Sequence, residues 1–421
     1  MQTPTDPIVD LPPVYPEVAY ILLLFGLFVV PRILQRYRVP AAITSLLLGV
    51  AAGPVLGLFP NDRTIGLLST LGIVSLFLFA GLDVEVDELK RVARAIGEHL
   101  GARVLALAAV GFVVAGVFAL PYRPAALISL ALLTPSTGFI LDSLPSLRLP
   151  EQTSFWVRAT AISTELLALA IMFVTLQSTT AAGLGLSAAV LAGMVLLLPV
   201  LFRGFARFIV PHAPRTEFAF LLMIAVVCAF VTRGLGVYYL VGAFVVGMVA
   251  QGFREQLPAM ASERMLHAVE AFGSIFVPFY FFHAGLVLRR EDLSLEALLI
   301  GGTLVVLGVP LRLLLVVVHR RVRFGERFNE SLRVGIPMLP TLVFTLVIAQ
   351  ILRDGFGLPP ALYGGLVVYA LVTTIIPSLV YRTPTPEFET LQIQPLPSEA
   401  RAQLGLTDPP RDPPWRGVEP T

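Results

Sequence analysis

Near the middle of one long apolar stretch of this 421-residue chain lies a single carboxylate, Glu165. The stretch runs from about Phe155 to Leu176, which is long enough to cross a lipid bilayer. An ionisable side chain at that depth is costly and is usually retained for a pathway, a partner or a proton. A low-dielectric site favours the protonated carboxyl group, whereas a nearby cation favours the carboxylate. Glu165 can therefore hold a proton or a small cation in turn, and one-site exchange requires that chemistry.

Hydroxyl groups near this carboxylate are candidates for the neutral oxygens that a dehydrated sodium or potassium ion needs. The candidates are Ser163 and Thr164, directly before Glu165, and Thr134, Ser136 and Thr137 in an earlier apolar stretch. Backbone carbonyls freed by the proline in that earlier stretch could add further oxygens. Alternatively, each hydroxyl bonds back to a carbonyl of its own helical turn, as is common in membrane helices. The sequence leaves both interpretations open.

A buried arginine is the natural charge partner to consider for Glu165. Arg312 lies in an apolar stretch, about seven residues before a basic loop. It could form a salt bridge with Glu165 that an entering cation must break. Alternatively, it extends along the apolar surface to the membrane interface, and we expect the same of Arg103. Arginine stays protonated, so exchange through Glu165 alone would move one proton per monovalent cation and be electroneutral.

Two further charged residues could line a vestibule that leads to the site. Asp142 follows the proline-containing break, and Arg158 precedes Glu165 by seven residues, which places it on the same helical face two turns away. Alternatively, Arg158 lies at the membrane interface and has no part in the site.

The composition identifies the class of protein. Hydrophobic residues make up 56% of the chain and charged residues 14%, whereas soluble domains carry about 25% charged residues. The chain is therefore an all-α polytopic membrane protein. The net charge of +2 gives no indication of nucleic-acid binding. A single cysteine, Cys228, excludes a disulfide framework and a cysteine metal site within one chain.

Thirteen apolar stretches are predicted to be transmembrane helices. They are 18–36, 40–58, 64–84, 97–120, 123–146, 154–178, 184–207, 216–234, 237–252, 269–288, 293–318, 331–353 and 358–381. Of the Lys and Arg residues that lie in loops between spans, most are in the loops that follow odd-numbered spans. The positive-inside rule then places the N-terminus outside the cell and the C-terminus in the cytoplasm.

The chain is predicted to have three parts. Residues 1–17, without Lys or Arg, form an extracytoplasmic N-terminal segment, and 18–381 form the membrane domain. Residues 382–421 are proline-rich and polar, which predicts a flexible cytoplasmic tail. That tail is too short and too polar to be a nucleotide-binding regulatory domain.

Two predicted spans are interrupted by prolines at corresponding places. The fifth contains Leu133-Thr-Pro-Ser-Thr-Gly138, and the twelfth contains Gly335-Ile-Pro-Met-Leu-Pro-Thr341. Each is the fifth span of a six-span half, 18–178 or 216–381, and 184–207 links the halves. An odd linking span gives the halves opposite topology, and matched broken helices are the best sequence indication of a transporter's binding site. We therefore expect the breaks to line the site, with the residues Thr134, Pro135, Ser136, Thr137, Pro340 and Thr341. The alternative is that both are ordinary proline kinks.

Five further stretches, in order along the chain, resemble the signatures of one transporter family. They are Arg38-Val-Pro40, Leu48-Gly-Val-Ala-Ala-Gly-Pro54, Leu71-Gly-Ile-Val-Ser-Leu-Phe-Leu-Phe-Ala-Gly-Leu-Asp83, Gly236-Val-Tyr-Tyr-Leu-Val-Gly-Ala-Phe-Val-Val-Gly247 and Phe276-Val-Pro-Phe-Tyr-Phe-Phe-His-Ala-Gly-Leu286. The chain resembles the monovalent cation:proton antiporter-2 family, bacterial sodium or potassium/proton exchangers, over nearly all of its length except the tail.

The resemblance implies inverted six-helix repeats with two crossing broken helices, a dimerisation domain and a mobile core that moves like an elevator. It implies that the sixth span carries the ion-binding acid, normally Asp-Asp, Asn-Asp or Gln-Asp, and this dipeptide falls on Thr164-Glu165. In electrogenic relatives a lysine pairs with the acid, and Arg312 is the nearest match here. The chain thus departs from the family pattern at both positions.

The expected function is exchange of Na⁺ or K⁺ for protons across the bacterial plasma membrane by a homodimer. The expected partners are that cation, protons and the lipid bilayer. We expect no enzymatic activity, no cofactor, no metal beyond the transported ion, and no nucleic acid. Two other interpretations remain: transport of a different solute, for example an organic anion attracted to Arg312, and a transport-inactive sensor or scaffold.

Overall fold

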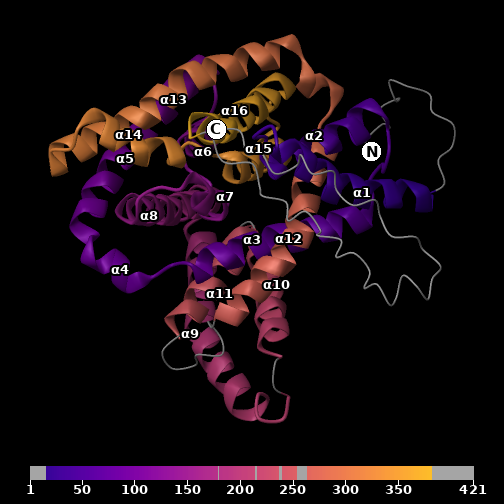
Figure 1. Ribbon diagram of the computed structural model, residues 1–421. Helices are drawn as coiled ribbons and strands as arrows, with labels where there is room; N and C mark the ends of the chain where they lie inside the picture. The colour runs from indigo at the N-terminus through magenta and orange to yellow at the C-terminus, as the bar shows by residue number, and fades with distance from the viewer. Residues whose placement is uncertain (1–15, 179, 214–215, 237–238, 254–262, 382–421) are drawn as a thin grey trace, which may run out of the picture. The chain divides into compact units, whose positions relative to one another are not determined.

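A computed structural model describes residues 16–178, 180–213, 216–236, 239–253 and 263–381 of the chain. The chain divides into two units, 1–385 and 386–421, and all described residues belong to the first. The predicted tail at 382–421 lies outside the described residues. So does most of the predicted N-terminal segment, whose last two residues begin the first helix. The described residues form helices and turns without a strand (Figure 1).

The described residues include ten helical segments that are long and apolar enough to span a membrane. They are α1 (Pro16–Gln35), α3 (Arg63–Leu82), α5 (Ala93–Val117), the segment Tyr122–Leu147, α8 (Glu151–Gln177), α9 (Ala181–Phe208), α10 (Glu217–Gly234), α12 (Glu263–Leu286), α13 (Leu295–Phe324) and α16 (Pro360–Val380). Together with the elements below, they place a helix or a pair of helices on each of the thirteen predicted spans.

The remaining predicted spans are short or bent. One is α2 (Ala41–Val50), continued by the π-helical turn η1 (Ala51–Val55), and another is α11 (Tyr239–Gly252). The third consists of α14 (Phe328–Gly335) and the 3₁₀ turn η5 (Ile336–Met338), followed by α15 (Leu342–Phe356) at an angle of 50°. A short helix, α4 (Val86–Arg91), and the 3₁₀ turn η4 (Arg290–Leu293) lie in connecting segments.

The segment Tyr122–Leu147 is broken where its proline predicts. It consists of α6 (Tyr122–Leu133), α7 (Thr137–Ser143) and the 3₁₀ turn η2 (Leu144–Leu147). Thr134, directly before Pro135, is extended, with φ −88° and ψ 126°. A proline ring clashes with a helical conformation of the residue before it, so α6 ends at this point.

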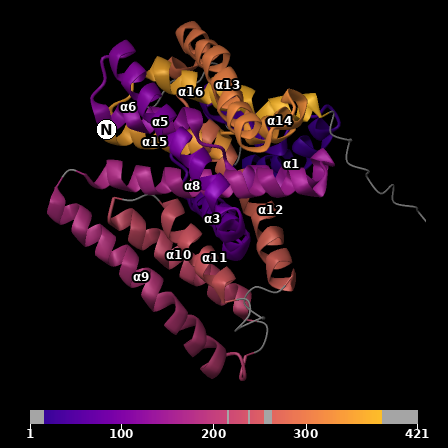
Figure 2. The same cartoon turned by 90° about the vertical axis from the view of Figure 1, so that its left-hand side faces the viewer.

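The helices pack as two groups. The scaffold group consists of α1, α2, α3, α9, α10, α11 and α12, and the core group of α5, α6, α7, α8, α13, α14, α15 and α16. Inside the scaffold group, α3 packs along both α11 and α12, and α9 lies beside α10 and α11 (Figure 2). The two groups meet mainly where α3 contacts α7 and where α8 contacts α9.

Glycines set the close packing of the scaffold group. A Cβ atom added at Gly49 would lie 2.0 Å from the backbone oxygen of Phe282, and one at Gly81 would lie 2.3 Å from that of Phe244. Helix backbones can approach this closely only where a side chain is absent. Apart from Gly236, which precedes α11 and has a φ of +75°, the glycines of the family-like stretches in the second, third, ninth and tenth spans are therefore helix-packing residues.

Replacing Gly247 with valine is expected to destabilise the protein. Its Cβ atom would lie 2.3 Å from the backbone oxygen of Leu78, so α3 and α11 would have to separate. Overpacking of this kind costs about 1–3 kcal/mol or more. Thermal unfolding of the purified protein in detergent measures the loss. Gly101→Val, at an exposed helical glycine with open space around its Cβ, is the matched control. Equal unfolding temperatures for the two variants would contradict the packing role of Gly247.

Candidate functional site

The two broken spans are joined to each other at their breaks. The backbone N–H of Ser136, between α6 and α7, donates a hydrogen bond of 2.8 Å to the carbonyl oxygen of Pro340, between η5 and α15. The Ser136 hydroxyl oxygen accepts a bond of 3.1 Å from the backbone N–H of Phe344. Backbone groups left without helical partners by the two breaks thus satisfy each other, as burial requires.

Glu165 reaches this crossing from α8. Its side chain is buried, and Oε2 accepts a hydrogen bond of 3.0 Å from the backbone N–H of Thr137, the first residue of α7. The first N–H groups of a helix have no partner within the helix, and its N-terminus carries a partial positive charge. Both effects favour a carboxylate at this position.

The hydroxyl groups around Glu165 divide into engaged and available ones. Ser163 and Thr164 donate to the carbonyls of Ala159 and Thr160 in their own helix, each at 2.7 Å. The Thr137 hydroxyl is buried, makes no hydrogen bond to a carbonyl of its own helix and interacts with the Glu165 carboxylate. It belongs to the residue whose N–H holds Glu165, so Thr137 offers the neutral oxygen most ready to bind an ion.

The remaining predicted lining residues are buried at the same crossing. The side chains of Thr134 and Thr341 are buried, and the Thr341 hydroxyl lies 3.0 Å from that of Thr373 on α16. That these residues line an ion-binding site stays a prediction.

The carbonyls at the end of α6 already have donors, contrary to the expectation that they are free to bind an ion. Each of the last three accepts a side-chain hydrogen bond: Ala131 from the Thr345 hydroxyl at 2.7 Å, Leu132 from the Tyr369 hydroxyl at 2.6 Å, and Leu133 from Nη1 of Arg103 at 2.9 Å. The physical reason is that a buried helix end must have its carbonyls satisfied.

The expected ion pair between Arg312 and Glu165 is not formed. The Arg312 guanidinium donates to the carbonyls of Leu339 and Met338, at 2.6 and 2.5 Å, at the break of the other span. The side chain is buried, so it does not extend to the membrane interface either. A cation at the carboxyl end of a helical segment neutralises its partial negative charge and satisfies its free carbonyls, and Arg312 does both.

Arg103 has the same role at the other break, which the sequence interpretation missed. Its buried guanidinium donates to Leu133 at the end of α6 rather than reaching the interface. One signal could have indicated this role. Arg103 and Arg312 lie in the fourth spans of the two predicted halves, each directly before the broken span.

Asp142 and Arg158 lie apart from these contacts. Asp142 is exposed on α7, and Arg158 is half-buried on α8. Neither forms an ion pair with another described residue. Their predicted place in a vestibule stays a prediction.

The fold and the site define a polytopic helical membrane protein in which two broken helices meet beside a buried carboxylate. Residues 21–384 match the family model described as sodium/hydrogen exchanger, transmembrane. The chain belongs to this sodium/hydrogen exchanger family.

Curated relatives and solved structures agree with this membership. The chain is 22% identical to the probable Na⁺/H⁺ antiporter 3 of Methanocaldococcus jannaschii, over 86% of this chain and 95% of that protein. It is 23% identical to the Na⁺/H⁺ antiporter of Enterococcus hirae, over 86% and 96%. The solved structure of the sodium proton antiporter MjNhaP1 from Methanocaldococcus jannaschii superimposes with a TM-score of 0.63 at 16% identity, covering 87% of this chain and 95% of that one. At this identity the structural likeness shows the fold.

Proposed function

We propose that the protein exchanges a monovalent cation, Na⁺ or K⁺, for protons across the plasma membrane. The observation that carries the proposal is Glu165, a buried carboxylate held by the Thr137 N–H where the two broken spans meet. The relatives named as Na⁺/H⁺ antiporters support it. Within the family, the motif stretches favour the monovalent cation:proton antiporter-2 type.

Proton and cation compete for the same carboxylate in the proposed mechanism. The Thr137 N–H donates to Oε2, and Oε1 is the other oxygen of the carboxylate. A proton on Oε1 makes the site neutral, whereas its loss creates the charge that attracts a cation. The Thr137 hydroxyl then supplies a neutral oxygen, and water supplies others. Since one side chain holds either ligand, each displaces the other.

The packing groups suggest how the site is exposed to the two sides in turn. The core group carries Glu165 and both breaks, whereas the close-packed glycines make the scaffold group a single unit. We infer that the core group moves against the scaffold group in an elevator-like displacement. The same proposal includes inverted repeats of 18–178 and 216–381 and a homodimer. It places the N-terminus outside the cytoplasm and the loops rich in Lys and Arg on the cytoplasmic side.

The proposed exchange is electroneutral. Glu165 is the carboxylate at the crossing, and the permanently charged Arg312 and Arg103 stay on backbone carbonyls. One proton would therefore leave for each cation that enters. Proteoliposomes test this directly, because turnover driven by membrane potential alone would contradict it.

Everted membrane vesicles test the exchange itself. After respiration has acidified the vesicles, added Na⁺ or K⁺ should restore the fluorescence of a quenched pH dye. Vesicles without the protein give the background. No response to any monovalent cation would instead favour transport of another solute, or a sensor or scaffold without transport.

Thr137→Val is expected to weaken cation binding without abolishing exchange. The variant keeps the backbone N–H that holds Glu165 but lacks the buried hydroxyl that interacts with the same carboxylate. Loss of one such interaction costs about 1–2 kcal/mol, so the KM for the cation should rise about 5- to 30-fold. Ser163→Ala is the matched control, because that hydroxyl bonds its own helix, and its KM should change less than about 2-fold. Equal effects in the two variants would remove Thr137 from the ion site.

A further inference from the structure

Along the described residues, the chain passes between the scaffold group and the core group three times. α3 leads into α5 through α4, α8 leads into α9, and α12 leads into α13 through η4. The first link follows an odd-numbered predicted span and lies on the side of the basic loops. The other two follow even-numbered spans and lie on the opposite side, which we call the outer side. The contacts that hold each link decide how the two groups can move against each other.

Gln177, the last residue of α8, ties the outer end of this core helix to two scaffold helices. Its side chain is buried, and Nε2 donates a hydrogen bond of 2.8 Å to the carbonyl oxygen of Leu235, the residue that ends α10. The last carbonyls of a helix have no partner within the helix, so this amide satisfies one of them. Oε1 of Gln177 accepts a bond of 3.0 Å from the buried Ser187 hydroxyl of α9. The link between α8 and α9 is only three residues long, 178–180, which further limits their separation.

Arg123 of α6 fixes the same end of α8 to the rest of the core group. Its guanidinium donates to the carbonyl oxygens of Thr175 and Leu176, at 2.9 and 2.6 Å. It also lies over the ring of Phe356 at the end of α15, with 5.5 Å between its carbon and the ring centroid. Hydrogen bonds from a charged donor are stronger than neutral ones. Gln177 therefore connects the core group as a whole, and not α8 alone, to the scaffold group.

Arg353, in the last turn of α15, holds the second outer link in a similar way. Nη1 donates to the carbonyl oxygen of Val287, directly after α12, at 3.2 Å, and Nη2 pairs with Asp292 of η4 at 2.5 Å. Asp292 is buried and also accepts from the backbone N–H of Arg289 at 2.7 Å. The guanidinium carbon lies 3.2 Å from the centroid of the Tyr363 ring on α16. The end of the scaffold helix α12 is thus fastened to two core helices.

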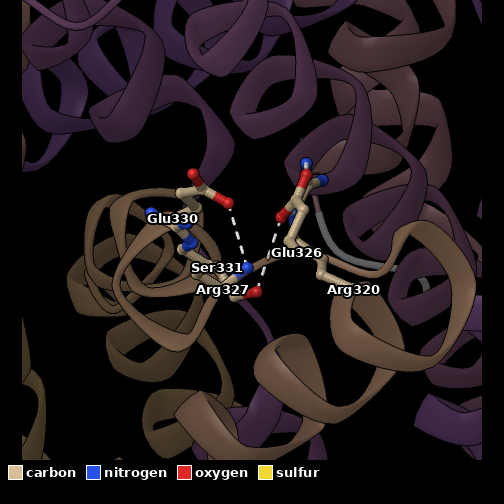
Figure 3. Close-up of polar contacts among 5 residues, drawn as sticks. All are labelled: Arg320, Glu326, Arg327, Glu330 and Ser331. Atoms are coloured by element: carbon tan, nitrogen blue, oxygen red, sulfur yellow. Dashed lines mark hydrogen bonds and ion pairs between the residues drawn. The ribbon is translucent and has the colours of Figure 1, made fainter.

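The core group is also held together at its basic end. Arg320, near the end of α13, makes a two-point ion pair with Glu326, at 2.5 and 2.7 Å. Glu326 also accepts a hydrogen bond from the Ser331 hydroxyl of α14, as Figure 3 shows. The Arg320 guanidinium lies over the Trp156 ring of α8, with 5.1 Å between its carbon and the ring centroid. Because these contacts join α8, α13 and α14 to one another, the basic ends of these core helices move together.

The link on the basic side is of a different kind. α4 is six residues long, and its ion pair between Lys90 and Asp87 is exposed and lies within the helix. Exposed pairs of this kind contribute about 0–1 kcal/mol. α4 packs on α5 and α8. It therefore accompanies the core group, and the chain can bend where α3 ends.

We propose that the core group turns about its outer end, on an axis anchored by Gln177 and Arg353. The proposal rests on the exchange function proposed above and refines the elevator-like displacement inferred there. Along α8, Glu165 lies about 18 Å from Gln177 and Glu151 about 39 Å, at about 1.5 Å per residue. Displacement in a rotation grows with the distance from the axis. The basic end of α8 should therefore move about twice as far as Glu165, while its outer end stays in place. Gln177 is a positioning residue in this movement.

Distances between spin labels test the axis without any transport measurement. The native cysteine is removed by Cys228→Ser. Labels at Glu151→Cys and Arg207→Cys report on the basic ends of α8 and α9, and labels at Tyr122→Cys and Gly234→Cys report on the outer ends of α6 and α10. All four labelled positions are exposed.

Each pair is measured at high pH with Na⁺ or K⁺ and at low pH without them, so that the cation or the proton is the ligand. The distance between the basic ends should change several times more than the distance between the outer ends. Equal changes in the two distances would overturn the proposal, and so would a constant distance between the basic ends.

Gln177→Leu is expected to slow exchange several-fold at saturating cation and to leave the KM for the cation nearly unchanged, because it loosens the axis and not the ion site. In the same variant the distribution of the outer distance should broaden. Ser187→Ala, which removes one of the two hydrogen bonds, should have the same effects to a smaller degree. Gln152→Leu, at an exposed glutamine near the other end of α8, is the matched control and should change neither quantity.

Two results would separate failure of the axis from failure of the exchange function. An unchanged outer distance in Gln177→Leu, or a raised KM, would overturn the role of Gln177 while exchange itself persists. Absence of exchange in the wild type would count against the proposed function.

Discussion

Glu165→Gln is expected to abolish the cation-dependent proton movement in everted vesicles. Glutamine has nearly the same size and can still accept the hydrogen bond from the Thr137 N–H. It can neither take up the exchanged proton nor provide a negative charge for the cation. We expect a loss of at least about 100-fold, which corresponds to ~2.7 kcal/mol or more, while thermal stability and membrane insertion stay near those of the wild type.

Glu165→Asp is the informative companion variant. Its carboxyl group titrates but is one methylene closer to α8, so its contact with the first turn of α7 lengthens. We expect reduced but measurable exchange with a raised KM for the cation. Full activity in Glu165→Gln would remove this residue from the mechanism. Inactivity of both variants with normal folding would show that the position of the carboxylate matters as much as its charge.

The helical segments and their breaks could be predicted from the sequence because the bilayer leaves few alternatives. A spanning segment must satisfy its backbone groups internally, so length and apolarity identify it. A proline removes a donor and bends the chain at a known residue. The end of α6 before Pro135 follows directly from these rules.

The partners of the polar groups at the site could not be predicted in the same way. A Ser or Thr hydroxyl in a helix always has a carbonyl of its own turn within reach. For Ser163 and Thr164 this local bond is the one formed, and the sequence cannot weigh it against a distant ion. The position of the Thr137 hydroxyl beside Glu165 became apparent only from the three-dimensional arrangement.

The prediction that Arg312 pairs with Glu165 was wrong for a related reason. A pattern of charges suggests that opposite charges pair, but a sequence does not show which backbone carbonyls lack a hydrogen-bond donor. The carbonyls of Met338 and Leu339 become acceptors only because the helix stops at that point. Arg103 and Arg312, at equivalent places in the predicted halves, each donate to carbonyls at one of the two breaks.

Arg312→Ala is expected to have the largest effect on stability among the variants considered. It leaves two buried carbonyls unsatisfied, at about 1–3 kcal/mol each, whereas Arg103→Ala leaves one. Thermal unfolding in detergent should therefore rank the wild type above Arg103→Ala, and Arg103→Ala above Arg312→Ala. Arg312→Lys should recover only part of the loss, because an ammonium group lacks the planar fork that reaches two carbonyls. Arg158→Ala, at a half-buried arginine, is the control and should change little.

Exchange measurements separate this capping role from a direct role beside the carboxylate. If Arg312 acts only on the break, Arg312→Ala should slow exchange at saturating cation, because the crossing of the two broken spans is distorted. The KM should change little, because the guanidinium does not compete with the cation for Glu165. If the guanidinium instead reaches Glu165 in another state of the transport cycle, its removal should lower the KM for the cation, because the cation would no longer have to displace a bound positive charge. A stable Arg312→Ala variant with a lowered KM would therefore contradict the capping role. It would support the hypothesis that Arg312 forms an ion pair with Glu165. The contacts with Met338 and Leu339 predict the opposite result, an unstable variant with a KM close to that of the wild type.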